Sequence, residues 1–211
     1  PLLARTFGAF ERDFLSTLSR YLPDRVACLW TGPQIVSKVI TVAHARKILR
    51  QLNRRLILWD NYPVNDLSMS TELHLGPLTG RDSRLPEVVY GYMNNPMLQP
   101  TLSLIPLATC LAYAKDPGRY RPEDSWERAV KACFGSTGLP HWRVIRTFCE
   151  RLNRMKEKQR VFPASLKQRK ALLAARGYLQ RRRKQKWFRE LNPWCRWIDE
   201  SLRLVPSSRL T

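Results

Sequence analysis

The sequence predicts an α/β region followed by a region built from helices alone. Up to about residue 114, helical periodicity alternates with short apolar runs that are typical of buried strands, whereas only helical periodicity follows from Pro122 onward. The composition, with 44% hydrophobic and 10% aromatic residues, is that of an ordinary globular protein. At 211 residues the chain can bury one good core or two small ones.

The first expected elements are an amphipathic helix and a buried strand. The helix ends before Pro23, and its apolar residues recur at spacings of three and four: Phe7, Phe10, Phe14, Leu18 and Tyr21. The apolar run 26–30 reads as a strand, because the tight-loop residues 31–33 close it.

The same alternation then repeats. Thr41 is expected to cap a helix with an apolar face, and a second buried strand follows at 55–59. A polar loop over about 60–85 leads to a third strand at 88–93 and a largely apolar helix at about 98–114. Successive strand–helix units of this kind surround a parallel sheet, but three strands cannot close a barrel.

The second half of the chain is expected to form a helical bundle. One helix includes residues 125–130, and further apolar positions follow at helical spacing: Trp142, Ile145, Phe148, Leu152, Met155, Leu166, Leu172, Leu179 and Trp187. The last helix is expected to be short, to start at Pro193 and to extend to Leu202.

The net charge of +20 is the unusual global feature of the sequence. Of the 37 Lys and Arg residues, 17 lie between Arg143 and Arg189, and the densest run is 181–186. The favoured interpretation is a solvated face of long helices. The alternative is a surface for nucleic acid or another polyanion, although no familiar nucleic-acid-binding motif accompanies the charge.

The cysteines and the apolar runs give little information about the cellular compartment of the protein. The five cysteines are scattered, without metal-ligand spacing, and are interpreted as buried or free thiols: Cys28, Cys110, Cys133, Cys149 and Cys195. They slightly favour a cytoplasmic protein, with secretion left open. Apolar stretches such as 102–114 are shorter than the roughly 20 residues that a membrane span needs, so no membrane segment is expected.

The stretch from Trp59 to Asp66 carries the clearest chemical signal. It begins where the second strand ends, and loops at the carboxyl ends of parallel strands line the active sites of α/β proteins. An indole, amides and a carboxylate suit a sugar, whose C–H face is apolar and whose hydroxyls need directed hydrogen bonds. Purely structural roles are the alternative, with Trp59 in a core, Asn61 in a turn and Asp66 as a cap.

Four motifs in order then resemble glycoside hydrolase family 84, the β-N-acetylglucosaminidases of the O-GlcNAcase type, formerly described as hyaluronidase-like. They are Trp30-Thr31-Gly32-Pro33, the stretch 59–66, Leu75-Gly76-Pro77 with Gly80-Arg81, and Asn95-Pro96-Met97. The resemblance implies strands six to eight of a (β/α)8 TIM barrel within residues 1–120, and a helical domain over 121–211.

The same resemblance implies roles for single residues. Asp66 would hold the 4- and 6-hydroxyls of a terminal N-acetylglucosamine, and Asn95 would bind hydroxyls of the same ring. Asn61 and Trp59 would lie beside the acetamido group, and further pocket-wall residues would be Trp30, Thr31, Gly32 and Tyr62.

The catalytic carboxylates of the family have no counterpart in this sequence. Substrate-assisted glycosidases use the acetamide oxygen of the substrate as nucleophile, and in this family two adjacent aspartates assist it. No Asp-Asp pair occurs in the 211 residues. We therefore expect a fragment without hydrolase activity of its own, prone to aggregate until the remaining barrel half packs against it, and without a metal or organic cofactor.

A second reading comes from a different class of protein. A chain that kept the sugar loop without the acid pair would be a non-catalytic carbohydrate- or polyanion-binding protein, with the basic helices as its contact surface.

Overall fold

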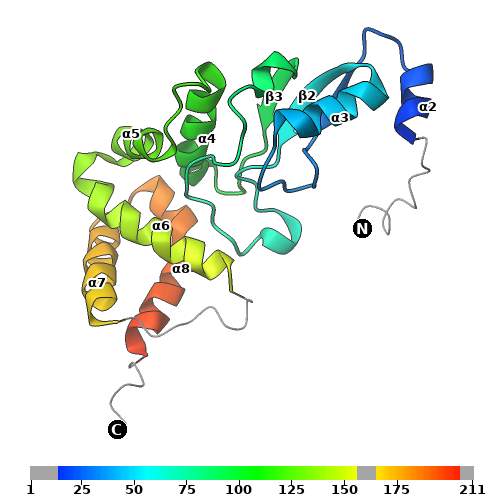
Figure 1. Ribbon diagram of the computed structural model, residues 1–211. Coiled ribbons are helices and arrows are strands. Elements are labelled where there is room, and N and C mark those ends of the chain that lie inside the picture. Colours follow the sequence, from blue (N-terminus) through cyan, green and yellow to red (C-terminus); the bar gives the residue numbers. More distant parts are fainter. Residues whose placement is uncertain (1–13, 156–164, 205–211) are drawn as a thin grey trace. The chain divides into compact units, whose positions relative to one another are not determined.

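The computed structural model describes residues 14–155 and 165–204, which form two compact units (Figure 1). The first unit contains the described residues up to Asn61 together with 79–94, and the second contains 62–78 and the described residues from Asn95 onward. The structure is thus a mixed α/β protein with one parallel sheet. Within the described ranges, no helix combines the length and the apolar character that crossing a bilayer requires.

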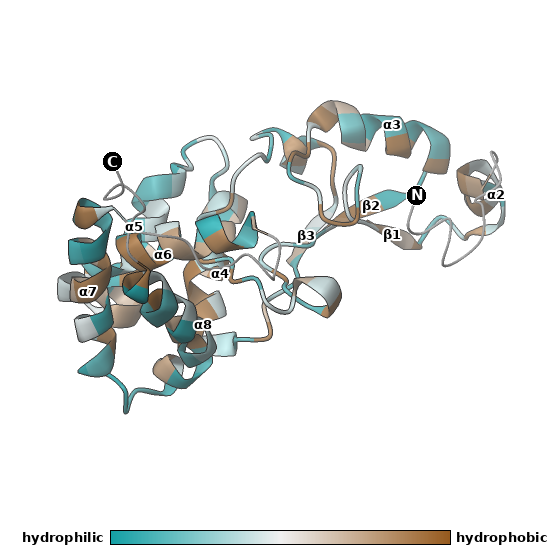
Figure 2. Cartoon of the chain, turned by 90° about the horizontal axis from the view of Figure 1, so that it is seen from below, coloured by the Kyte–Doolittle hydropathy of each residue, from teal (hydrophilic) through white to brown (hydrophobic). Residues whose placement is uncertain are grey.

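The first unit is built on a three-stranded parallel sheet with the order β1-β2-β3. The strands are β1 (Ala27–Trp30), β2 (Arg55–Asp60) and β3 (Gly91–Asn94). Helix α2 (Phe14–Tyr21) precedes β1, and α3 (Val42–Leu52) lies over one face of the sheet (Figures 1 and 2). Phe7 and Phe10, at the start of the first expected helix, lie outside the described residues.

Helix α3 confirms the predicted cap at Thr41. The Thr41 hydroxyl accepts from the backbone N–H of His44, and Nδ1 of His44 accepts from the backbone N–H of Thr41. Asn53 ends the helix in the left-handed conformation, with φ of 47°. The buried face of α3 then joins an aliphatic core cluster: Ile40, Ala45, Leu52, Leu56, Leu58 and Leu85.

The third strand begins three residues later than the predicted 88–93. Leu85–Glu87 forms a 3-10 turn, and the N–H groups of Val88 and Val89 donate to the carbonyl of Leu85 rather than to a strand. Sheet pairing therefore starts only when Tyr90 N–H donates to the carbonyl of Leu56. An apolar run indicates that its side chains are buried, and the two valines do pack on the core. It does not distinguish a strand from a turn as the backbone conformation.

The outer strands β1 and β3 each pair only with β2 within the described part of the chain. Leu29 on β1 is 54% exposed and Met93 on β3 is 47% exposed. Strand edges with exposed apolar side chains are sites where further strands can add. The predicted tendency to aggregate follows from this feature and stays a prediction.

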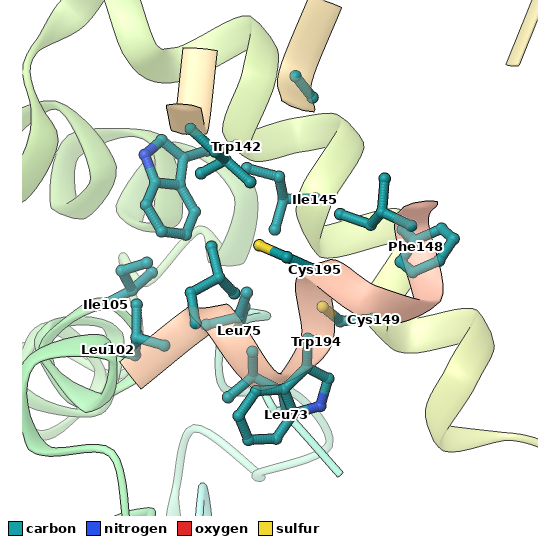
Figure 3. Close-up of a cluster of buried hydrophobic side chains, with 14 of the residues drawn as sticks. Leu73, Leu75, Leu102, Ile105, Trp142, Ile145, Phe148, Cys149, Trp194 and Cys195 are labelled. Atoms are coloured by element: carbon teal, nitrogen blue, oxygen red, sulfur yellow. The ribbon is translucent and has the colours of Figure 1, made fainter. Parts of the chain in front are cut away.

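The second unit packs five helices around a core rich in tryptophan. The helices are α4 (Pro100–Lys115), α5 (Pro122–Phe134), α6 (Leu139–Asn153), α7 (Leu166–Gln180) and α8 (Lys186–Arg203). Figure 3 shows side chains of α6, such as Trp142 and Ile145, close to those of α8, and Leu73 and Leu75 from the loop between β2 and β3 belong to the same cluster. Most of the helices of this unit are hydrophobic on one side and hydrophilic on the other (Figure 2).

The last helix is longer than predicted. It begins at Lys186 rather than at Pro193, which lies inside α8. A proline lacks the N–H that would donate to the preceding turn of a helix. It therefore fits best in the first turn, where that N–H has no partner, and this is why Pro193 predicted a helix start. The buried face of α8, which includes Trp187, Leu191, Trp194 and Ile198, spans both sides of Pro193 and keeps the helix continuous. The basic run 181–186 lies mainly in the turn between α7 and α8, not on a helical face.

The five cysteines are free thiols, as predicted. Cys110, Cys149 and Cys195 are buried in the second unit, Cys133 is exposed and Cys28 is half-buried.

Candidate functional site

The loops that follow β1 and β2 are joined in the first unit by Asn61. The indole N–H of Trp59 donates to Oδ1 of Asn61 (3.0 Å), and Nδ2 of Asn61 donates to the carbonyl of Ile35 (2.8 Å). Trp59 is half-buried at the end of β2. The structure therefore brings Trp59 and Asn61 together and ties both to the loop after β1, as their shared position at the carboxyl ends of parallel strands requires.

The loop after β1 is a tight turn held by its own hydroxyl groups. Thr31 Oγ1 donates to the carbonyl of Gln34 (3.1 Å), and Ser37 Oγ donates to the same carbonyl (2.8 Å). Gly32 is buried with φ of 93°, and a Cβ there would collide with the Ser37 hydroxyl. The residue therefore has to be glycine. Trp30 packs partly buried on the core of this unit.

Asp60 and Arg81 form a buried ion pair that the sequence reading did not assign. Two parallel hydrogen bonds of 2.7 and 2.5 Å join the guanidinium to the carboxylate, whose side chain is 1% exposed. The hydroxyl of Tyr92 donates to the same carboxylate (3.0 Å). The carboxylate of Asp60 is thus fully engaged in holding together β2, β3 and the segment around Arg81.

Asn65 performs a similar joining role in the second unit. Its side chain is fully buried, and Nδ2 donates to the carbonyl of Glu72 (2.8 Å) and to Oε1 of Gln99 (2.7 Å). Its Oδ1 accepts from the N–H of Leu98 (2.8 Å). One amide therefore links the loop that contains Asp66 to the loop that begins at Asn95.

Asp66 offers a carboxylate that is not used internally. It precedes a short 3-10 turn (Leu67–Met69) but makes no side-chain capping bond, and no hydrogen bond or ion pair to its carboxylate occurs among the described residues. The next residue, Leu67, has φ of 48° and is 88% exposed. Asp66 is half-buried, as is Asn95 directly after β3. A half-buried carboxylate without an internal partner can accept hydrogen bonds from a ligand.

Tyr62 turns its hydroxyl to the main chain. The hydroxyl donates to the carbonyl of Gly76 (2.8 Å), and burial raises the pKa of Tyr62 well above its ordinary value. A Cβ on Gly76 would lie 3.1 Å from a carboxylate oxygen of Glu150, so the motif Gly76-Pro77 is packed tightly. The hydroxyl of Tyr62 therefore anchors the stretch 59–66 to the motif Gly76-Pro77, and only the ring of Tyr62 remains for a pocket wall.

Sequence reasoning missed Arg81 and Asn65 as organising residues for different reasons. Arg81 stands in one of the quoted motifs and Asp60 in another, so their pairing could have been proposed. The partners of Asn65 are main-chain groups and Gln99, which carry no sequence signal. No cluster of three metal-ligating side chains occurs in the described ranges.

Comparison with known proteins places these features in a family. Residues 5–147 match the family model described as beta-N-acetylglucosaminidase. The curated proteins named Protein O-GlcNAcase from Rattus norvegicus and from Mus musculus are each 30% identical over 105 residues. Those residues are 50% of this chain and 11% of the relative, so the chain spans only a small part of the curated relatives it matches.

Solved structures show the same likeness. A mutant of the Thermobaculum terrenum O-GlcNAc hydrolase, in which one aspartate is replaced by asparagine, is 29% identical, with a TM-score of 0.74 over 89% of this chain and 45% of the solved chain. The structure of CpGH84B, at 21% identity and a TM-score of 0.74, covers 90% of this chain and 37% of the solved one and supports the fold. Because the family model matches more than half of its residues, this chain belongs to the β-N-acetylglucosaminidases of glycoside hydrolase family 84.

Proposed function

We propose that this chain is the sugar-binding part of an O-GlcNAcase-type β-N-acetylglucosaminidase that removes terminal β-linked N-acetylglucosamine with retention of configuration. The observation that carries the proposal is the stretch from Trp59 to Asp66. It follows β2 at its carboxyl end, contains the Trp59–Asn61 pair and ends on a carboxylate that no described residue occupies.

Each candidate residue has a chemical task in this proposal. Asp66 accepts hydrogen bonds from the 4- and 6-hydroxyls of the sugar, and Asn95 bonds hydroxyls of the same ring. Asn61 faces the acetamido group, and the indole of Trp59 forms part of the wall around it. Asn65 holds the loop of Asp66 against the loop of Asn95 through its three hydrogen bonds.

The proposed architecture assigns residues 1–120 to the last three strand–helix units of a (β/α)8 barrel and residues 121–211 to a helical domain after it. The parallel order β1-β2-β3 and the alternation with α3 and α4 support this assignment. Strands added at the edges of β1 and β3 would close the barrel, and they would cover Leu29 and Met93. The polypeptide that carries those strands is the first partner we propose.

The proposed mechanism needs two carboxylates that this chain does not supply. The acetamide oxygen of the substrate attacks its own anomeric carbon, one aspartate orients the acetamide, and a second protonates the leaving oxygen and later deprotonates water. The 211 residues contain no adjacent aspartates, and Asp60 is occupied by Arg81. By itself the chain would bind the sugar without cleaving it. The proposed substrates are glycoproteins or glycans that end in N-acetylglucosamine.

Substitution of Asp66 tests the proposal. In the enzyme that joins these residues to the acid pair, Asp66→Ala should lower kcat/KM for a chromogenic β-N-acetylglucosaminide by about 100-fold or more. Two hydrogen bonds to a charged acceptor, each contributing about 1.5–3 kcal/mol, are lost. The matched control is Glu200→Ala, an exposed carboxylate near the end of α8, which should leave the kinetics unchanged. Unchanged kinetics in Asp66→Ala would refute the assigned role.

A further inference from the structure

One end of the helical bundle gathers positive charge from two segments that lie far apart in the sequence. The turn from Arg181 to Gln185 joins α7 to α8, and apart from Gln185 every residue from 181 to 186 is basic. Figure 2 shows this turn as hydrophilic. The ring of Tyr178 stacks on His141 at the start of α6, with centroids 4.6 Å apart. The end of α5 belongs to the same region, because Phe134 contacts Trp187 at 5.2 Å. Lys131 lies in the last turn of the same helix and is exposed. We call these residues, with Arg189, the basic end.

No carboxylate offsets the basic end within the described residues. The segments 131–142 and 177–189 contain no Asp or Glu. The nearest acids in sequence are engaged elsewhere: Glu127 pairs with Arg143, and Glu190 accepts from the N–H groups of Thr101 and Leu102. None of the described ion pairs involves Lys131 or the run 181–186. The charge therefore faces solvent unneutralised.

The positive charges of the basic end affect the protonation of the neighbouring His141. Partial burial, and then the guanidinium groups of Arg181 and Arg182, lower the pKa of His141. The guanidinium carbon of Arg182 lies over the ring of Tyr178, 3.9 Å from its centroid, and this cation–π contact favours one position of the guanidinium.

The aromatic rings of this end point inward. Tyr178 is 2% exposed and Trp187 is 8% exposed, and no large hydrophobic residue of the two segments is exposed. Single-stranded nucleic acids and sugars stack on exposed aromatic side chains, and membrane surfaces bind exposed apolar side chains. A basic surface without either is suited to a ligand that presents only phosphates at high density. Arginine, the commoner cation here, bonds phosphate through two parallel N–H groups.

We propose that the basic end of the helical domain binds the phosphate backbone of double-stranded nucleic acid without sequence specificity. This function is separate from the sugar site and does not depend on the hydrolase assignment. Binding of this kind is driven by the release of counterions, so its affinity falls steeply with salt.

The test compares two variants of the same chain with equal changes in charge. Arg181→Gln/Arg183→Gln/Lys184→Gln removes two arginines and a lysine from the basic end, and Arg46→Gln/Lys47→Gln/Arg50→Gln removes the same types from the exposed side of α3. Fluorescence anisotropy with a labelled duplex of about 20 base pairs measures affinity between about 50 and 200 mM salt. The unaltered chain should lose roughly 100-fold or more in affinity over that range.

The first variant should bind at least about tenfold more weakly at about 100 mM salt, with a salt slope reduced by up to about 0.9 for each residue replaced. It should also raise the pKa of His141 toward its ordinary value in an NMR titration, because Arg181 is gone. The α3 variant should retain most of the affinity. Equal losses in the two variants, tighter binding to single-stranded RNA, to a sulfated glycan or to anionic vesicles, or a salt-independent affinity would each overturn the proposal.

Discussion

At the scale of single residues, side-chain hydrogen bonds made by Asn61 and Asn65 fix the loops that carry the candidate sugar-binding residues. Motifs single out Trp59, Asn61, Asp66 and Asn95, and the structure places each at or beyond the carboxyl end of a strand. Their proposed contacts with a sugar stay predictions. Several of the hydrogen bonds that organise these loops join residues 21 to 34 positions apart, as in the Asp60–Arg81 pair. Such pairing follows from the folded path of the chain and has no local signature.

Asn65 should be one of the most sensitive positions of the second unit. Asn65→Ala removes a fully buried amide and leaves the partly buried N–H of Leu98 and carbonyl of Glu72 without their partner, so the free energy of unfolding should fall by about 1–3 kcal/mol. Urea unfolding followed by tryptophan fluorescence measures the change. The matched control is Asn192→Ala on the exposed side of α8, which should change stability by less than about 0.5 kcal/mol. Similar unfolding midpoints for the two variants would contradict the role given to Asn65.

Asp60 should matter for stability rather than as an acid in catalysis. Asp60→Asn leaves the guanidinium of Arg81, 5% exposed, without its charge partner, and the first unit should lose about 3–5 kcal/mol. Thermal unfolding of the two proteins measures the loss. Asp24→Asn is the control, because that carboxylate is 99% exposed although it also pairs with an arginine, and surface pairs contribute little. If the two substitutions had the same effect, the Asp60–Arg81 pair would not be holding the sheet.

At the scale of elements, periodicity located most helices and two of the three strands. It failed where a local signal and tertiary packing disagreed. Pro193 normally marks a helix start, yet α8 runs through it because the apolar face on both sides is buried in the core. Val88 and Val89 are β-branched residues typical of strands, yet their N–H groups donate to the carbonyl of Leu85 in the turn at Leu85–Glu87.

The proline inside α8 leads to a prediction of increased stability. Pro193 is exposed, so Pro193→Ala restores a backbone donor to the helix without disturbing the core. Proline costs about 3 kcal/mol inside a helix, and part of that gain is lost because alanine makes the unfolded chain more flexible. We expect the free energy of unfolding to rise by about 1–2 kcal/mol in urea titrations. A decrease would show that the core requires the helix geometry that proline imposes.

At the scale of the whole molecule, the two units have cores of very different size. The first unit is held by a small aliphatic cluster behind the sheet, whereas the second buries five tryptophans among its helices. Buried apolar area is the main stabilising term in folding, so the first unit should unfold more readily when it is not supported by further strands.

The cysteines provide a direct test of this difference. In native protein a maleimide should label exposed Cys133 first, and buried Cys149 should stay protected, because burial also raises the pKa of the Cys149 thiol. With increasing urea, Cys28 in the first unit should become reactive at a lower concentration than Cys149, as read by mass spectrometry of labelled peptides. Simultaneous labelling of Cys28 and Cys149 would instead show that the two units unfold together.

The sequence by itself determined the family, the alternation of strands and helices, and the loops that carry the candidate sugar-binding residues. These depend on local patterns, which are set by periodicity, turn residues and motif spacing. Only the tertiary structure decided that Asp60 pairs with Arg81, that Asn65 joins the loops of Asp66 and Asn95, and that the basic run lies near His141 at the start of α6. The physical reason is that these features arise from contacts between distant segments, and hydrogen bonds and charges act over distances in space rather than along the chain.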